Sequence, residues 1–297
     1  MPLPTTGEVT ELELPAQGWT LGQALKDPAV EEPINRWVHR PLAFALIRPL
    51  EHLELPVTPN LITLLSGVAG LAAAACYYHA LEGGAAFTLA GALLLFASVI
   101  LDCADGMLAR LTGAGSRFGM LLDGFVDSVV GISVWYGVSH TLCGQVHAWW
   151  AWPACVLMLP TILVHCALYD DAKNRYLRAV GPLRAATPRP TSRVERALDA
   201  VYRTVYGSIA AGTTAPSAAL GVDRDLARRE LALPMRLTAF IGLGSHLVVI
   251  YTTTLLSAIE PGLALQVMAA VLLLGLNVLM VAALVGWTRA WHRLGGN

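Results

Sequence analysis

The sequence predicts an all-α integral membrane protein with six transmembrane helices and an N-terminal interfacial amphipathic helix. Composition is the first reason, because 55% of the 297 residues are hydrophobic, 14% are charged and the mean hydropathy is +0.57. The second reason is that six apolar segments are each long enough to cross a bilayer as a helix. The third is that the lysine and arginine residues gather on one predicted side of the membrane.

The six predicted spans are joined by short connections, except for one long polar insert. They cover 58–80, 86–111, 116–141, 147–169, 234–257 and 262–288. Thr58 and Ser116 are suited to cap the first and third helices, and Pro59 fits the first helical position. The polar, proline-containing stretch 170–233 predicts a cytosolic insert with at least one surface helix.

The chain before the first span divides into two parts. Residues 1–32 are polar and contain proline and glycine, which predicts a loosely ordered N-terminal tail. Residues 33–57 carry apolar side chains at mostly helical spacing, which predicts an interfacial amphipathic segment, broken near Pro41 or Pro49. Three arginines fall among these apolar residues: Arg36, Arg40 and Arg48. An ordinary surface helix is the alternative.

The distribution of positive charge predicts the orientation. With six spans, both termini, the turn between spans two and three and the insert share one side. All 20 lysine and arginine residues fall on that side or at its helix ends, and the opposite loops 81–85, 142–146 and 258–261 contain none. The positive-inside rule makes the basic side cytoplasmic, so we expect a multi-pass protein of the cell (inner) membrane.

Four aspartates lie within the second and third spans: Asp102, Asp105, Asp123 and Asp127. Helical spacing places each pair on one face of its helix, and the tight turn at 112–115 makes the two helices antiparallel neighbours. The acidic faces can then meet, roughly 15 Å from the cytoplasmic edge. A charge in hydrocarbon costs at least about 2.5–3.5 kcal/mol, so clustered acids require a polar cavity and counter-charge. Facing carboxylates predict a site for two Mg²⁺ or Mn²⁺ ions.

Small residues and one arginine accompany the acids. Gly106 and Gly119 remove side chains where the helices face each other, which leaves room for a ligand. Arg110 lies at the cytoplasmic end, where a guanidinium can bind a phosphate with two hydrogen bonds. Metal ions beside it would neutralise phosphate charge during an in-line displacement.

Other functions for the carboxylates stay open on the residues alone. A cation-binding membrane transporter is the main alternative, although transporters more often place acids near the midplane on broken helices. A polar helix-packing network and a catalytically inactive membrane scaffold are further alternatives. The net charge of −1 gives no indication of a nucleic-acid partner.

The stretch 102–127, DCADGMLARLTGAGSRFGMLLDGFVD, resembles the signature of the CDP-alcohol phosphotransferases. That signature reads D, two residues, DG, two residues, AR, eight residues, G, three residues, D, three residues, D, and every fixed position is present. The run TPNLIT at 58–63 resembles the usual opening of the family's first span. The resemblance covers roughly 33–170, and 234–290 by architecture only. The insert 170–233 is longer than a compact member needs.

The resemblance implies a transferase of phospholipid biosynthesis, with 58–297 as its catalytic membrane domain and a site facing the cytoplasm. A CDP-linked lipid would donate its phosphatidyl group to an acceptor alcohol, and CMP would leave. The implied metal ligands are Asp102, Asp105, Asp123 and Asp127. Asp127 would also be the general base that removes the acceptor's proton. The implied nucleotide-binding residues are Asn60, Gly106, Ala109, Arg110 and Gly119. The resemblance also implies a homodimer.

The acceptor is predicted only by charge. Lys173, Arg236 and Arg289 fall at cytoplasmic ends of spans, where they would bind a phosphorylated acceptor such as inositol phosphate or glycerol phosphate. Ordinary positive-inside anchoring is the alternative. His246 lies in the middle of the fifth span, which predicts an interhelical hydrogen bond rather than a metal ligand.

Overall fold

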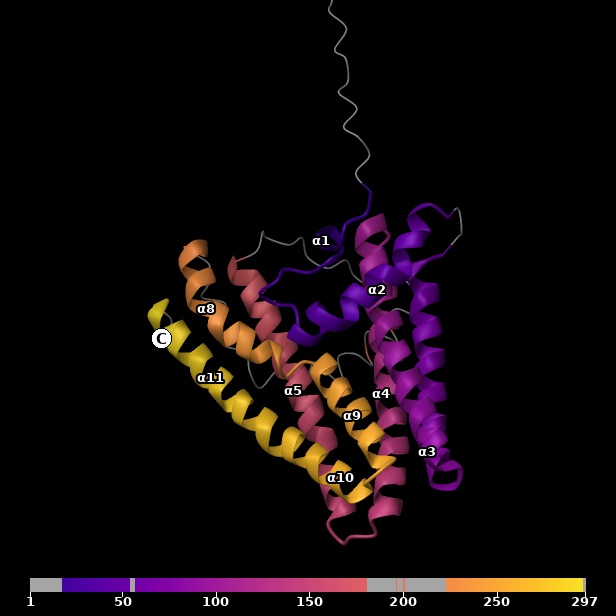
Figure 1. Ribbon diagram of the computed structural model, residues 1–297. Helices are drawn as coiled ribbons and strands as arrows, with labels where there is room; N and C mark the ends of the chain where they lie inside the picture. The colour runs from indigo at the N-terminus through magenta and orange to yellow at the C-terminus, as the bar shows by residue number, and fades with distance from the viewer. Residues whose placement is uncertain (1–17, 54–56, 181–195, 197–199, 201–222, 296–297) are drawn as a thin grey trace, which may run out of the picture.

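The computed structural model describes residues 18–53, 57–180, 196, 200 and 223–295, and regular structure in these residues is helical. Within these residues, five helical stretches are long and apolar enough to cross a membrane: Pro59–Thr112, Arg117–Val146, Ala151–Val180, Arg224–Ser257 and Pro261–Arg293. They form one bundle, with the short N-terminal helices at its upper end (Figure 1). This arrangement confirms the predicted all-α class with several apolar helices.

Helix α3 (Pro59–Thr112) contains a reversal of the chain. Its 54 residues are interrupted by Gly84, whose φ of 63° and ψ of −153° are non-helical. This backbone region is essentially restricted to glycine. The two halves lie antiparallel, because the Ser66 hydroxyl donates to the Ser98 carbonyl at 3.0 Å and the Ser98 hydroxyl donates back at 2.9 Å. Helix α3 therefore contains both segments predicted as 58–80 and 86–111.

The predicted helix caps around α3 and α4 (Arg117–Val146) are confirmed. Thr58 Oγ1 accepts a hydrogen bond from Leu61 N at 3.2 Å, and Ser116 Oγ accepts one from Gly119 N at 2.9 Å. Gly113 ends α3 with a left-handed φ of 66°. The short connection makes the second half of α3 and α4 neighbours, as the sequence predicted.

The predicted bounds of the last spans and of the insert need correction. Helix α5 (Ala151–Val180) continues past residue 169, and α8 (Arg224–Ala239) begins before residue 233. Both ends of the predicted insert 170–233 are therefore helical, because they pack on each other through an apolar cluster that includes Tyr176 and Leu231. Most of the remaining insert lies outside the described residues.

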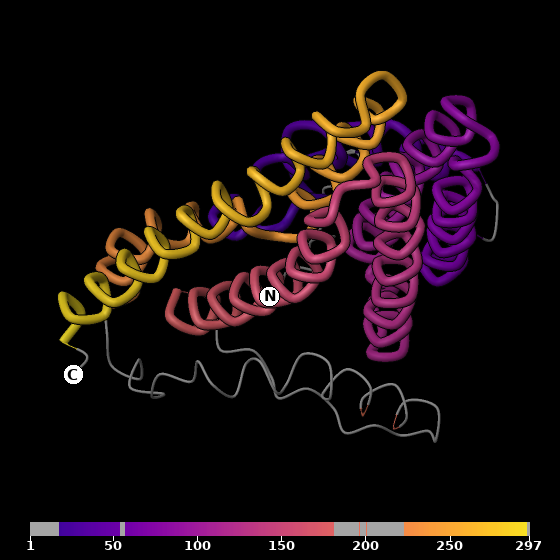
Figure 2. The backbone as a smooth tube through the Cα atoms, turned by 90° about the horizontal axis from the view of Figure 1, so that it is seen from below, coloured from indigo at the N-terminus to yellow at the C-terminus, as the bar shows by residue number. Residues whose placement is uncertain are grey.

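The predicted fifth span is interrupted near its start. Residues 240–242 separate α8 from α9 (Leu243–Ser257), so the segment 234–257 is not one helix. The last apolar stretch consists of α10 (Pro261–Ala269), the π-helix η4 (Ala270–Gly275) and α11 (Leu276–Arg293). Figure 2 shows this stretch along one side of the molecule, with α11 leading away from α3 and α4, while α10 contacts α4.

The N-terminal segment is more ordered than the sequence predicted. It comprises α1 (Leu21–Ala24), the π-helix η1 (Asn35–His39), α2 (Arg40–Ile47) and the 3₁₀ helix η2 (Arg48–Glu51). The helix continues through Pro41 and becomes a 3₁₀ helix at Arg48, next to Pro49. Residues 18–32 are not a loose tail, because Ala24 is fully buried with residues of α2 and α3, including Ile47 and Met107.

Candidate active site

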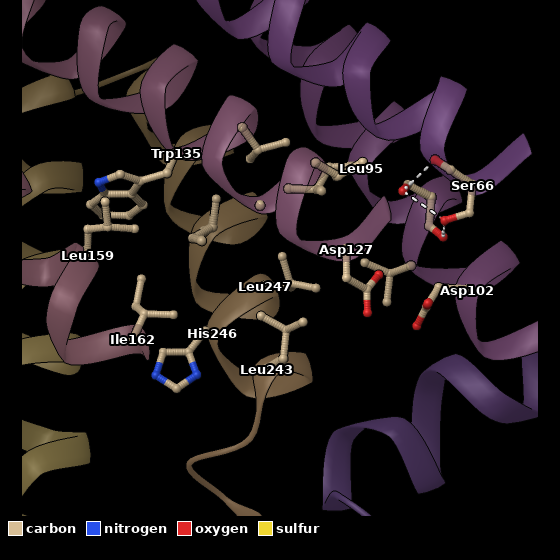
Figure 3. A pocket seen from close by; sticks show the side chains of 16 residues that line it. Ser66, Leu95, Asp102, Asp127, Trp135, Leu159, Ile162, Leu243, His246 and Leu247 are labelled. Carbon is tan, nitrogen blue, oxygen red and sulfur yellow. Dashed lines mark hydrogen bonds between the residues drawn. The ribbon is translucent and has the colours of Figure 1, made fainter. Parts of the chain in front are cut away.

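Three of the four predicted aspartates converge between α3 and α4. Asp102, Asp123 and Asp127 each offer a carboxylate oxygen, and these oxygens lie within 4.8 Å of one another. Each side chain is partly buried. Figure 3 shows Asp102 and Asp127 projecting from neighbouring helices toward the same space. The helical spacing therefore predicted correctly that these acidic faces meet.

Asp105 lies outside this group of three. Its carboxylate accepts a hydrogen bond from Thr63 Oγ1 at 2.5 Å, and only 6% of the residue is exposed. The three-residue step from Asp102 turns Asp105 by about 60° around the helix, toward the first half of α3. Thr63 was within the TPNLIT run, but nothing in the sequence alone paired it with Asp105.

The converging carboxylates fit a divalent cation. Asp123 Oδ1 is buried and has no hydrogen-bond partner in the described part of the chain. Leaving a buried acceptor unsatisfied costs about 1–3 kcal/mol, and more when it is charged. Mg²⁺ and Mn²⁺ prefer hard oxygen ligands such as these carboxylates. A cation would satisfy this oxygen and reduce the repulsion within the cluster.

Gly119 and Asn60 lie against each other, at the starts of α4 and α3. A Cβ atom at Gly119 would lie 2.8 Å from Asn60 Oδ1. Such a distance is too short for a carbon and an oxygen, so glycine at 119 permits the position of the Asn60 amide. Two of the predicted nucleotide-binding residues are therefore brought together, from the start of α3 and the start of α4.

Arg110 lies against Gly106 on the last turns of α3, where Ala109 is partly exposed. A Cβ atom at Gly106 would lie 3.4 Å from Arg110 Nη1. Arg110 Nε donates to the Ala24 carbonyl at 2.7 Å, which fixes the guanidinium. Its Nη2 is buried and has no hydrogen-bond partner in the described residues. A fixed cation with one unused donor is suited to bind a phosphate oxygen.

A cavity of about 80 Å³ continues from Asp102 and Asp127 into the apolar part of the bundle. Its remaining wall is mostly apolar and comes from α3, α4, α5 and α9, with His246 at one side (Figure 3). His246 Nε2 lies 3.1 Å from His165 Nδ1 on α5, and its Nδ1 donates to the Gly242 carbonyl at 2.8 Å. The predicted interhelical hydrogen bond of His246 is confirmed.

The three predicted acceptor-binding residues differ in their surroundings. Lys173 on α5 forms an ion pair with Asp170, and its Nζ lies 5.0 Å from the centre of the Tyr169 ring. Arg236 on α8 and Arg289 on α11 are exposed. Neither of these arginines makes a hydrogen bond or ion pair with another described residue, so they are available to solvent.

Charged residues of the N-terminal segment were missed as part of this region. Arg40 Nε lies 2.8 Å from Glu31 Oε1, and both side chains are almost fully buried. Burial raises the pKa of Glu32 to about 7, and the nearby Lys26 and the backbone amides of Gly244 and Ser245 oppose this shift. The polar composition of residues 1–32 predicted a loose tail and gave no indication of these contacts. They depend on the tertiary structure, because they join segments that are far apart in the sequence.

The part of the chain that carries these residues matches a known protein family. Residues 56–188 match the family model of the CDP-alcohol phosphatidyltransferases. Residues 56–188 therefore correspond to a CDP-alcohol phosphatidyltransferase domain. This transferase domain contains α3, α4 and α5, and with them the four aspartates and all five predicted nucleotide-binding residues.

Curated relatives carry related names. The chain is 31% identical to an archaetidylinositol phosphate synthase of Pyrococcus horikoshii, over 38% of this chain and 50% of that protein. It is 31% identical to a phosphatidylinositol phosphate synthase of Mycobacteroides abscessus, over 42% of this chain and 50% of that protein. A CDP-diacylglycerol–serine O-phosphatidyltransferase of Encephalitozoon cuniculi is 38% identical over 31% of this chain and 25% of that protein. The chain thus spans at most about half the length of these relatives.

Proposed function

We propose that this protein transfers a phosphatidyl group from a CDP-linked lipid donor to an acceptor alcohol and releases CMP. The observation that carries this proposal is the convergence of Asp102, Asp123 and Asp127 within the transferase domain. The names of the relatives support a role in phospholipid biosynthesis. The family match supports a transferase, and no finding supports the cation-transporter alternative.

We propose that the acceptor is a small polar alcohol that carries a phosphate, such as inositol phosphate or glycerol phosphate. Two relatives are named as an archaetidylinositol phosphate synthase and a phosphatidylinositol phosphate synthase, which supports the first of these. The accessible Arg236 and Arg289 and the partly buried Lys173 offer positive charge for such an acceptor. A serine-using relative shows that the family name alone does not select the acceptor.

The proposed cofactor is Mg²⁺ or Mn²⁺, with two ions held by Asp102, Asp105, Asp123 and Asp127. When bound, the ions would neutralise the diphosphate and the charge that develops on the leaving CMP. The unsatisfied oxygen of Asp123 supports this assignment. Asp105 would keep its orientation through the Thr63 hydroxyl.

Protein groups would perform the remaining steps. The Asp127 carboxylate would accept the proton of the acceptor hydroxyl, which must come within hydrogen-bond distance. The acceptor oxygen forms a new bond to the phosphorus attached to the lipid, the P–O–P bond breaks, and its electrons leave with CMP. Arg110 Nη2 would donate to a phosphate oxygen. Asn60, Gly106, Ala109 and Gly119 would shape the nucleotide site, since the two glycines leave room for the ligand.

We further propose how the chain lies in the membrane. The two halves of α3 would be separate spans, because the helix reverses at Gly84, and six spans then result. Segment 33–57 would lie at the interface. The confinement of lysine and arginine to one side supports termini and a site that face the cytoplasm of a cell (inner) membrane. We also propose that the protein forms a homodimer and contacts membrane lipids.

The test is CMP release by the purified full-length chain with CDP-diacylglycerol and Mg²⁺. The acceptors are inositol phosphate, glycerol 3-phosphate, serine, inositol and none. We expect release that depends on one acceptor, and a loss of roughly 10²–10⁴-fold in Asp127→Asn, the range for removal of a general base. Asp225→Asn, an exposed aspartate of α8, is the matched control. Equal release by Asp127→Asn and the wild type would disprove the assigned chemistry.

A further inference from the structure

The N-terminal segment passes beside the cytoplasmic end of the active site. The carbonyl of Ala24 accepts a hydrogen bond from Arg110 on α3 at 2.7 Å. The carbonyl of Val30 accepts one from the Tyr169 hydroxyl on α5, also at 2.7 Å. Residues 25–29 therefore bridge two helices of the transferase domain. Figure 1 shows the segment, with α1 in it, across the upper end of the bundle.

Lys26 is the only lysine or arginine in this bridge, and it faces other cations. Its charge interacts with those of Arg40, Lys173 and Arg110, and with the carboxylate of Glu31. It also interacts with the carboxylates of two cluster members, Asp102 and Asp123.

The other cations in this group already have partners, whereas Lys26 has none among the described residues. Arg40 is paired with Glu31, Lys173 is paired with Asp170, and the Nε of Arg110 is bound to a carbonyl. Within the described residues, no carboxylate lies at ion-pair distance from Lys26, although its side chain is accessible to solvent. An accessible ammonium group close to other cations is suited to bind an anionic ligand. The unused Arg110 Nη2 is a second donor at this position.

We infer that Lys26 is a substrate-binding residue, whose ammonium group binds a phosphate of the substrate together with Arg110 at the cytoplasmic mouth of the site. This inference rests on the proposed function, because it assigns a ligand to the same site. The chemistry required is a phosphate oxyanion, which both the donor diphosphate and a phosphorylated acceptor supply. Divalent ions on the aspartates would hold other oxygens of the same ligand, so the phosphate would lie between two kinds of positive charge.

Chemical labelling tests this inference without turnover. The chain has two lysines, Lys26 and Lys173, so acylation by an amine-reactive ester followed by mass spectrometry reports each one separately. The full-length protein is labelled in Mg²⁺ with no ligand, CDP-diacylglycerol, inositol phosphate or inositol. We expect a phosphate-bearing ligand to reduce labelling of Lys26 at least fivefold, and inositol to leave it unchanged. Protection by CDP-diacylglycerol alone identifies the donor diphosphate, and protection by inositol phosphate alone identifies the acceptor phosphate. Equal labelling of Lys26 in all four samples overturns the inference.

Kinetics of Lys26→Gln separate ligand binding from an indirect conformational effect. We expect KM to rise at least tenfold for the phosphate-bearing substrate that gives protection, with no change in Tm, and Lys26→Arg to restore part of the loss. Arg48→Gln removes an exposed cation of the same N-terminal segment and is the matched control. Values of KM within twofold of the wild type for both donor and acceptor would overturn the inference. CMP release without protection of Lys26 would disprove the role of Lys26 and leave the proposed function intact. Protection of Lys26 without CMP release would disprove the proposed function and leave the binding role of Lys26 intact.

Discussion

At the scale of single residues, the four aspartates differ in the groups that surround their carboxylates. Asp102 and Asp105 are three residues apart on the same helix, yet one joins the cluster of Asp123 and Asp127 and the other is bound to Thr63. The difference arises from the direction in which each carboxylate leaves α3. A hydroxyl opposite Asp105 holds that carboxylate in place. The other three lie close together, so a bound cation would reduce their mutual repulsion.

Removing the Thr63 hydroxyl should impair the metal site without disrupting the bundle. Thr63→Val keeps the shape of the side chain and leaves the buried Asp105 carboxylate without this donor, which costs about 1–3 kcal/mol. We expect the Mg²⁺ concentration for half-maximal CMP release to rise at least tenfold, while Thr63→Ser stays close to the wild type. An unchanged Mg²⁺ dependence in Thr63→Val would show that Asp105 is not a metal ligand whose orientation depends on this bond.

At the scale of elements, the N-terminal segment is tied to α9 by buried polar groups. His39 Nδ1 lies 2.7 Å from Asn35 Oδ1, and its Nε2 lies 3.2 Å from the Tyr251 hydroxyl on α9. Glu32 fills the space beside Gly242, where a Cβ atom would lie 2.3 Å from the Glu32 Cδ. Burial lowers the pKa of His39 to about 4, so this contact forms with a neutral imidazole at physiological pH.

These shifts predict an unusual pH dependence for Glu32→Gln. Burial raises the pKa of Glu32 from its ordinary 4.5 to about 7, so the folded state favours the protonated acid. Its contribution to stability is complete below pH 4.5 and is lost as the pH rises toward and through 7, by at most about 1.4 kcal/mol per pH unit. Glutamine resembles the protonated acid and does not titrate.

We therefore expect the Tm of Glu32→Gln, relative to the wild type, to increase between pH 5 and pH 8. The opposite contribution of His39, which is lost as the pH falls from 6.5 through 4, is present in both proteins and cancels in this comparison. Glu82→Gln changes a side chain that is 88% exposed and serves as the control. A Tm difference that is constant over this range would contradict the burial of an acid at residue 32.

At the scale of the whole molecule, the candidate active site lies between α3 and α4, which are connected by a short turn and both carry negative charge. Helices α3 and α4 pack against each other, although the carboxylates of Asp102, Asp123 and Asp127 repel one another where they meet. In a low-dielectric interior such repulsion is large unless it is compensated. The stability of the transferase domain should therefore depend on the ions that the aspartates bind.

Mg²⁺ should accordingly raise the Tm of the detergent-solubilised protein, and a chelator should reverse the effect. Binding to the folded state alone contributes about 2.7 kcal/mol when the free ion is at 100 times its Kd. We expect Asp123→Asn, which removes the carboxylate with the unsatisfied oxygen, to lose most of this shift. Asp225→Asn should retain it. A shift of the same size in Asp123→Asn would indicate that Mg²⁺ stabilises the protein elsewhere.

The features that the sequence predicted correctly depend on local rules. Apolar length defines most of the helices, and the cap residues Thr58 and Ser116 mark helix starts because their oxygens accept from the next turn. The meeting of the two acidic faces was predicted from helical periodicity and from the short turn between the two helices. The break at 240–242 and the extension of α5 to Val180 could not be predicted in this way, because they depend on packing against other segments.

The sequence by itself therefore determined the helical membrane class, the reversal between antiparallel helices and the convergence of Asp102, Asp123 and Asp127. These follow from interactions between residues that are near each other along the chain, where spacing and turn length leave few alternatives. Only the tertiary structure decided that Asp105 is held by Thr63 and that residues 18–32 bring Lys26 to the site. Those contacts join segments far apart in the sequence, and their formation depends on which side chains fill the space between packed helices.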